Sequence, residues 1–197
     1  MTWAGLKRYG WAALCCLVLV AVAGCTSLQG SGDKGYVSGD GSLTLVAQSD
    51  RGDVVELTGD DLEGKPLDLA DFRGKPLVVA VWGYWCGPCN AEAPELVEAA
   101  EKLDGVADFV GINVRDGSQA QAISFVRKYG LPYRSFYSPD SKALLSFPGT
   151  LTATSVPATV VLDADGRVAA SVRGTIPSVQ TLVDVVQDLA DEGTADG

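Results

Sequence analysis

The feature that most restricts the fold is a pair of cysteines, Cys86 and Cys89, placed between a buried strand and a long helix. Residues 77–82 form a continuous apolar, β-branched run, which is typical of a central strand buried on both faces. Residues 86–103 then carry apolar side chains at helical spacing. A thiol at a helix N-terminus faces unpaired backbone N–H groups and the positive end of the helix dipole, which stabilise its thiolate. The two-residue spacing also lets Cys89 reach Cys86 and form a disulfide.

The absence of histidine narrows the chemistry open to this chain. The sequence has five cysteines and no histidine, which excludes Ser-His-Asp hydrolases, Cys-His proteases and His-ligated zinc or copper sites. A zinc half-site at Cys86 and Cys89 would need two further ligands, and the other cysteines, Cys15, Cys16 and Cys25, lie at the N-terminus. No flavin or nicotinamide motif is present. We therefore predict thiol chemistry without a metal or a cofactor.

The charge balance argues against two classes of partner. The formal net charge is −10, with 15 basic and 25 acidic residues. Loss of Lys7 and Arg8 with a signal peptide would leave 15 − 2 = 13 basic residues against 25 acidic ones, a net charge of −12. Nucleic acids need basic partners for their phosphates, and anionic lipid headgroups likewise attract basic segments. We predict no nucleic-acid binding and no membrane adhesion by charge alone.

The N-terminus is typical of an export signal. Lys7 and Arg8 precede an apolar stretch at residues 11–23, which is shorter than the roughly 20 residues of a membrane span. The stretch ends at Val22-Ala23-Gly24-Cys25, which resembles the lipobox of bacterial lipoproteins, in which the cysteine is lipidated. The resemblance implies an extracytoplasmic protein anchored to the bacterial cell membrane through Cys25. An ordinary cleaved signal peptide or a short uncleaved anchor, with Cys25 incidental, is the alternative.

Composition divides the chain into four predicted segments. A signal peptide occupies residues 1–24, and a flexible Gly-, Ser- and Asp-rich linker occupies residues 25–42. One globular domain follows at residues 43–190, and residues 191–197 form a disordered tail.

Within the domain, strand and helix patterns alternate. Besides residues 77–82, apolar runs predict strands at residues 54–57, 66–69, 109–114, 133–137, 159–162 and 168–172. Helical spacing predicts further helices at residues 120–129, 142–147 and 179–189. Asp163-Ala-Asp-Gly166 predicts a hairpin turn. This order implies an α/β fold with a mixed sheet flanked by helices.

The motif around the cysteines is similar to the active-site signature of the thioredoxin superfamily. Trp85, Gly87 and Pro88 complete the Trp-Cys-Gly-Pro-Cys sequence, and Pro94 matches the proline inside the active-site helix of that superfamily. Val156-Pro157, before a buried strand, resembles the cis-proline loop that faces the dithiol. The resemblance implies a cis bond at Pro157 and pairing of a substrate polypeptide with the backbone of Val156. A trans proline that simply enters a strand is the alternative.

A closer resemblance is to the extracytoplasmic TlpA and ResA branch, which includes the DsbE-related cytochrome c maturation reductases. Residues 69–76 resemble its lead-in to the central strand, and residues 117–151 resemble its strand–helix insertion before the cis-proline. The N-terminal strands match its β extension. Glu92 matches the acid of its CxxCxxExP arrangement, which implies a carboxylate that manages the protons of the dithiol. The alternative is that Glu92 is one exposed acid among Glu92, Glu95 and Glu98. The buried aspartate of cytoplasmic thioredoxins is replaced by Ala80.

These features predict a thiol–disulfide oxidoreductase that acts on exported proteins with disulfides or thiols. Gly87-Pro88 is the dipeptide of reducing thioredoxins, which favours a reductase, for example of apocytochrome c. The redox partner would be a membrane dithiol carrier, or a quinone-linked oxidase if the protein instead forms disulfides. A non-catalytic binding module is the alternative of another class. A peroxiredoxin would have threonine where Gly83 stands, and a Sco-type copper protein would need a histidine and a wider cysteine spacing.

Overall fold

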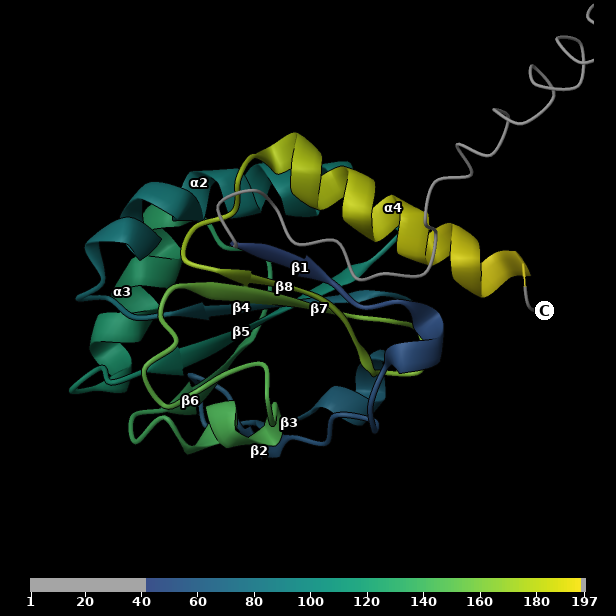
Figure 1. Cartoon of the computed structure of the whole chain (residues 1–197). Coiled ribbons are helices and arrows are strands. Elements are labelled where there is room, and N and C mark those ends of the chain that lie inside the picture. Colours follow the sequence, from purple (N-terminus) through teal and green to yellow (C-terminus); the bar gives the residue numbers. More distant parts are fainter. Residues whose placement is uncertain (1–41, 196–197) are drawn as a thin grey trace, which may run out of the picture. The chain divides into compact units, whose positions relative to one another are not determined.

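A computed structural model describes residues 42–195, which include the predicted domain and form one six-stranded sheet with a separate two-stranded hairpin (Figure 1). The predicted signal peptide, Cys25 and the linker up to residue 41 lie outside the described residues, as do residues 196–197.

The central sheet is mixed, with the strand order β1-β8-β7-β4-β5-β6. Its parallel half is β4 (Leu77–Trp82), β5 (Asp108–Val114) and β6 (Ser135–Ser138). Its antiparallel half is β7 (Ala158–Leu162), β8 (Val168–Arg173) and β1 (Leu43–Leu45). Every residue of β4 is buried, as the continuous apolar run predicts for a strand between two neighbours and two covered faces. The thioredoxin-like α/β fold predicted from the sequence is confirmed.

The two faces of the sheet have different covers (Figure 1). The helices α2 (Gly87–Lys102) and α4 (Val179–Ala195) pack on one face, against side chains such as Val78 and Val161. The other face is covered by the hairpin of β2 (Thr58–Asp60) and β3 (Pro66–Asp68) and by the short 3-10 helices η2 (Leu69–Phe72) and η3 (Lys142–Ser146). A further 3-10 turn, η1 (Gln48–Asp50), follows β1.

The third long helix, α3 (Gln119–Tyr129), packs against the beginning of α2 at the end of the sheet where β4 stops. Phe125 of α3 stacks on Trp82, the last residue of β4, with ring centroids 4.5 Å apart. Ser118 caps the helix, and Gly130 ends it in the left-handed conformation. The helix thus helps to enclose the junction between β4 and α2.

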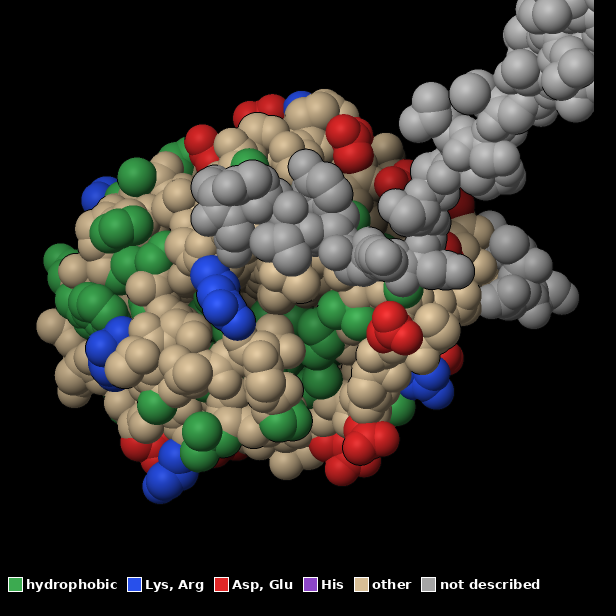
Figure 2. Space-filling view, in the orientation of Figure 1, with side chains coloured by type: hydrophobic (Ala, Val, Ile, Leu, Met, Phe, Trp, Pro, Cys, Tyr) green, Lys and Arg blue, Asp and Glu red, His purple; other side chains and the backbone are tan. Residues whose placement is uncertain are grey.

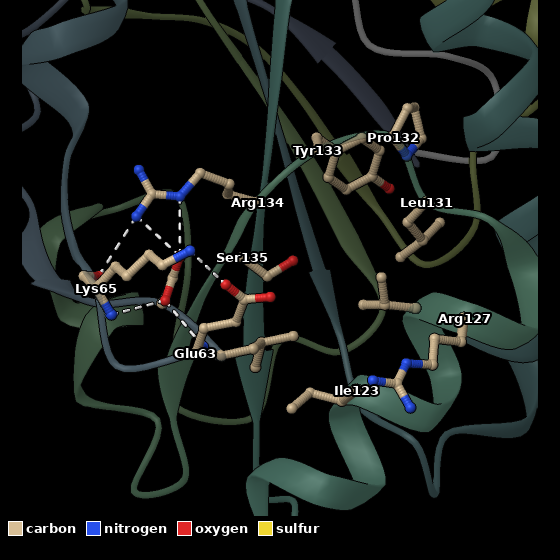
Figure 3. A pocket seen from close by; sticks show the side chains of 12 residues that line it. Glu63, Lys65, Ile123, Arg127, Leu131, Pro132, Tyr133, Arg134 and Ser135 are labelled. Atoms are coloured by element: carbon tan, nitrogen blue, oxygen red, sulfur yellow. Dashed lines mark hydrogen bonds and ion pairs between the residues drawn. The ribbon is translucent and has the colours of Figure 1, made fainter.

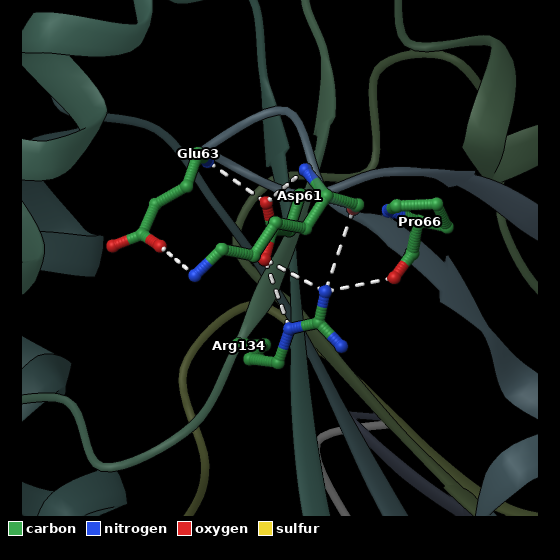
Figure 4. Close-up of polar contacts among 5 residues, drawn as sticks. Asp61, Glu63, Pro66 and Arg134 are labelled. Atoms are coloured by element: carbon green, nitrogen blue, oxygen red, sulfur yellow. Dashed lines mark hydrogen bonds and ion pairs between the residues drawn. The ribbon is translucent and has the colours of Figure 1, made fainter.

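An ion pair between buried Asp61 and exposed Arg134 joins the β2–β3 hairpin to the sheet (Figure 4). Asp61 accepts hydrogen bonds from the backbone N–H groups of Glu63 and Lys65, at 2.8 and 2.9 Å, and from Arg134 Nε at 2.9 Å. Arg134 also donates to the carbonyl of Pro66. Burial alone would raise the pKa of Asp61, but the bonds from Lys65 and Arg134 leave it below its ordinary value.

The elements near the N-terminus of the domain differ most from the sequence prediction. Residues 54–57 belong to no strand, because their backbone groups bond to separate segments: Val55 donates to Gly166, and Leu57 accepts from Leu69. The strand expected there begins instead at Thr58. The sequence prediction also lacked β1, which is only three residues long and is held by its backbone pairing with β8.

The C-terminal helix is longer than predicted. We expected a disordered tail from Asp191, but α4 continues to Ala195. The apolar periodicity ends at Leu189, so the sequence pattern gave no sign of the last turn. Glu192 in that turn pairs with Arg51 at 2.6 Å, and this contact between distant segments is invisible to local periodicity.

We predict that Arg51→Ala destabilises the domain by about 2 kcal/mol, because it breaks a largely buried charge network. The Arg51 side chain is 4% exposed and bonds to Val46 O, Asp163 and Glu192. Lys65→Ala, which removes a pair exposed on both sides, should change the free energy of unfolding by less than about 1 kcal/mol. Urea unfolding of the two variants checks this, and equal losses would contradict the role given to Arg51.

Candidate active site

The two cysteines lie at the junction between β4 and α2. Cys86 is the N-cap of α2, and its Sγ accepts a hydrogen bond from the backbone N–H of Cys89 at 3.1 Å. The structure joins Cys86 and Cys89 in a disulfide, with Cα atoms 5.2 Å apart, and the two residues are 3% and 2% exposed. Gly87 and Pro88, both exposed, form the first turn of the helix. The N-cap position places the sulfur of Cys86 beside unpaired N–H groups and the positive end of the helix dipole.

The last residue of β5 and the loop after it hold the residues before Cys86 through hydrogen bonds. The backbone N–H of Tyr84 donates to the carboxylate of Asp116 at 2.9 Å, and Trp85 Nε1 donates to the carbonyl of Val114 at 3.2 Å. Gly83 leaves room for this turn, since a Cβ there would lie 2.6 Å from Trp85 Nε1. Trp85 itself remains 47% exposed. These contacts hold Trp85 at the surface directly before the first cysteine.

Asp116 and Asn90 support this junction, and our sequence prediction named neither. Asp116 is buried, accepts a second bond from Asn113 Nδ2 at 2.7 Å, and has its pKa raised by burial. Asn90 donates to the carbonyls of Tyr84 and Cys86 and accepts from the hydroxyl of Tyr129 at 2.8 Å. Two sequence signals could have identified them. Asn90 is a polar residue directly after Cys89, and Asp116 is an acid two residues after the end of β5.

The loop before β7 lies against the dithiol. The Val156–Pro157 peptide bond is cis, as the sequence predicts. Val156 packs on the apolar cluster that contains Cys86 and Cys89, and Pro157 is buried. Ladder pairing with β4 begins only at Ala158, which lies opposite Val81. Within the described part of the chain, the backbone N–H and C=O of Val156 bond to no other residue, so this short edge is open to a partner strand.

Glu92 is buried one turn beyond Cys89. It is 4% exposed, which excludes the alternative that it is one more acid on the outer face of the helix, where Glu95 and Glu98 lie. Its Oε1 accepts the backbone N–H of Ile176 at 2.6 Å. Burial raises the pKa of Glu92 to about 7, even though the bond from Ile176 lowers it. This carboxyl group can therefore gain or lose a proton near neutral pH.

Glu92 and Cys89 line one small internal cavity together with Tyr133. The Tyr133 hydroxyl is buried and bonds to no other described residue. Burial raises its pKa above the usual range, and the charge of Glu92 adds to this effect. Tyr133 was not among the predicted site residues, because it lies in a predicted strand and has no motif around it.

A pocket of about 410 Å³ lies away from the cysteines (Figure 3). It is bordered by Ile123 and Arg127 of α3, by Glu63 and Lys65 of the β2–β3 turn, and by the segment that leads into β6. None of the predicted site residues lines it. Within residues 42–195, no group of His, Cys, Asp or Glu side chains could hold a metal ion, and no helix is long and apolar enough to cross a membrane.

The mixed sheet with its helices and the Cys86–Cys89 disulfide at the start of α2 define a thioredoxin-fold protein. The Redoxin family matches the chain over residues 47–187. The chain belongs to this family.

Individual relatives agree with the branch predicted from the sequence. The thiol-disulfide oxidoreductase ResA of Bacillus cereus is 29% identical over 115 residues, which are 58% of this chain and 64% of ResA. The chain thus spans slightly less than two thirds of that relative. A DsbF homologue from Corynebacterium diphtheriae is 35% identical with a TM-score of 0.71, covering 79% of this chain and 98% of its own. A secreted thiol-disulfide isomerase from Corynebacterium glutamicum is 30% identical with a TM-score of 0.73, covering 80% and 97%. The resemblance to the TlpA and ResA branch is confirmed.

We predict that Glu92 makes the domain less stable as the pH rises. Its pKa is about 7 in the folded chain and 4.5 when unperturbed, so between these values the folded state binds more protons than the unfolded state. Stability from this group is complete below pH 4.5 and is lost as the pH rises through 7. The pKa difference corresponds to about 3 kcal/mol.

Urea unfolding of the oxidised protein at pH 5 and pH 8 tests this expectation. Glu92→Gln keeps an acceptor for the Ile176 N–H and should remove most of the loss. Glu95→Gln, at an exposed position of the same helix, serves as the control and should behave like the wild type. Identical pH profiles for Glu92→Gln and the wild type would contradict the assigned pKa.

Proposed function

We propose that this protein is a thiol–disulfide oxidoreductase that works through Cys86 and Cys89. The observation that supports this most strongly is the disulfide at the N-cap of α2, beside the open backbone of Val156. The relatives named as thiol-disulfide oxidoreductase and isomerase support the same activity. Trp85, Gly87 and Pro88 shape the turn, while Val156 and Pro157 form the edge that receives a substrate polypeptide as an added strand.

In the reducing direction, the thiolate of Cys86 attacks one sulfur of a substrate disulfide. That S–S bond breaks, a mixed disulfide with Cys86 forms, and the other substrate sulfur leaves as a thiolate that takes up a proton. Cys89 then loses its proton and attacks Cys86, which releases the second substrate thiol. Two electrons pass to the substrate, and the Cys86–Cys89 disulfide remains. Glu92 accepts the proton of Cys89, a role supported by their shared cavity and by a pKa of about 7.

This mechanism predicts that the reduced protein cleaves the interchain disulfides of insulin and that Cys86→Ser abolishes the reaction. Insulin turbidity in the presence of dithiothreitol measures the rate. Cys89→Ser keeps the attacking thiol but cannot resolve the mixed disulfide, so it should accumulate a covalent adduct visible on a non-reducing gel. An inactive wild type would leave the binding module as the function, because a non-catalytic domain could still hold polypeptides at Val156.

The direction of electron flow that we propose is reduction of exported proteins, apocytochrome c among them. The Gly87–Pro88 dipeptide between the cysteines favours it. A disulfide-forming oxidase is the alternative, and the two directions call for different membrane partners: a dithiol carrier or a quinone-linked oxidase. The reduction potential of the Cys86/Cys89 pair, measured against glutathione, separates them. We expect a value near about −270 mV, whereas a value near about −120 mV would indicate an oxidase.

We further propose that the protein acts outside the cytoplasm, anchored to the cell membrane through a lipid on Cys25. Its lipobox-like sequence supports the anchor, and the secreted relative from Corynebacterium glutamicum supports export. The Gly- and Ser-rich residues 26–42 would then tether the domain to the membrane.

A further inference from the structure

Three basic side chains adjoin the dithiol junction without a carboxylate partner. They are Arg115, Lys128 and Arg173, and none of them takes part in an ion pair within residues 42–195. Lys128 lies 3.5 Å from Asn90 Oδ1 and over the ring of Tyr129. Arg115 and Arg173 lie in the two segments that flank the cysteines and the cis-proline loop. Such an arrangement is unexpected in a chain with a net charge of −10.

Arg115 is held directly beside the active-site turn. Its guanidinium carbon lies 4.3 Å from the centroid of the Trp85 ring, in cation–π geometry. Its two neighbours in sequence fix its backbone, since Val114 accepts from Trp85 and Asp116 accepts from Tyr84. Arg115 adopts a left-handed conformation, with φ of 57°. The stacked guanidinium is thus positioned next to the residue that precedes Cys86, and its N–H groups bond to no other described residue.

Arg173 adjoins the other side of the site, at the cis-proline loop. It is the last residue of β8 and lies opposite Ala158, two residues after Val156. The next residue, Gly174, donates its N–H to the carbonyl of Pro157 at 3.1 Å. Arg173 is exposed, so it stands near the edge where we place the substrate strand.

Three acids near this end of the sheet have partners, whereas Glu95 is exposed on α2 and its charge acts on Glu92. Asp116 and Glu92 are buried and accept backbone N–H groups, and exposed Asp140 pairs with Lys142 at 2.7 Å. In Figure 2, the end toward which β4 runs in Figure 1 displays hydrophobic and basic side chains. Acidic side chains in the same view lie above α2 and α4, toward the opposite end, and at the lower left beside a basic side chain. Within residues 42–195, the three basic side chains beside the cysteines thus have no acidic ion-pair partner.

We propose that this surface selects partner polypeptides that carry acidic residues beside the reacting cysteine, with Arg115 and Arg173 as specificity-determining residues. The proposal rests on the proposed function and adds the chemistry of its substrates. A guanidinium group binds a carboxylate through two parallel N–H···O bonds, and its stacking on Trp85 keeps it in place before the partner arrives. Opposite charges on the two surfaces also speed encounter at low ionic strength.

The test uses the full chain in a non-ionic detergent and three peptides with one internal disulfide each. The peptides differ only in the residues flanking the cysteines, which are Asp, Asn or Lys. Cys86 and Cys89 of the reduced protein become a disulfide as the peptide disulfide becomes two thiols, and stopped-flow tryptophan fluorescence gives the rate constant. We expect the acidic peptide to react about tenfold faster than the basic one at low salt, with a much smaller ratio at 0.5 M salt.

Substitutions of single arginine residues test which of them cause the preference for the acidic peptide. Arg115→Asn, which tolerates the left-handed backbone, and Arg173→Gln should each lower the acidic-to-neutral rate ratio about threefold. Arg115→Lys should restore part of it. Arg167→Gln removes an exposed cation from the β7–β8 turn and should leave the ratio unchanged.

The outcomes of this experiment separate failure of the charge preference from failure of the proposed activity. Equal wild-type rates for the three peptides would overturn this inference while the proposed activity stands. An equal loss for all three peptides in Arg115→Asn would also overturn it, because Arg115 would then act on the reactivity of Cys86. No reaction with any peptide would instead overturn the proposed function.

Discussion

The burial of β4 on both faces is the constraint on which the rest of the structure depends. A strand with no exposed residue must have paired neighbours on both sides and a cover on each face, which is why β5, β7, α2 and the hairpin layer assemble around it. The chain can leave such a strand only at its end, and there it turns into α2. The cysteines occupy this turn, so a fully buried strand fixes the position of the sulfur atom at the helix N-terminus.

The parallel pairing of β4 with β5 then positions the residues that follow the two strands. Trp82 lies opposite Asn113, so the residues after both strands emerge side by side. This register explains why Val114 and Asp116 can hold Trp85 and Tyr84 with ordinary hydrogen bonds. Glu92 lies on α2 one turn beyond Cys89 and links this helix to another segment. Its buried carboxyl is bonded to the loop before α4, so the helix carrying the cysteines is joined to the C-terminal part of the sheet cover.

Much of this could be predicted from the sequence, and what could not has physical reasons. The strand β4 and the helix with Cys86 and Cys89 follow from local patterns, because burial and helical periodicity act over a few residues there. The cis bond at Pro157 was implied by the resemblance to the thioredoxin superfamily. The strand expected at residues 54–57, the missing β1 and the last turn of α4 depend on contacts between distant segments, such as Arg51 with Glu192. The burial of Glu92 was left open, since spacing on a helix cannot tell which face a neighbouring loop will cover. Asp116 and Arg115 were not predicted because the β4–β5 register sets their contacts with Tyr84 and Trp85. Asn90 was not predicted because it bonds to Tyr129 of α3, a distant segment.

Arg115 lies in a different segment of the chain from the two cysteines, so the two can change independently. The thiol chemistry belongs to α2 and its N-cap, whereas Arg115 belongs to the loop after β5 and contributes nothing to the core. Its backbone is held by the carbonyl of Val114 and the carboxylate of Asp116, neither of which depends on the side chain between them. Under the proposed function, a single substitution at Arg115 therefore changes which polypeptides react, while the geometry of Cys86 and Cys89 stays the same.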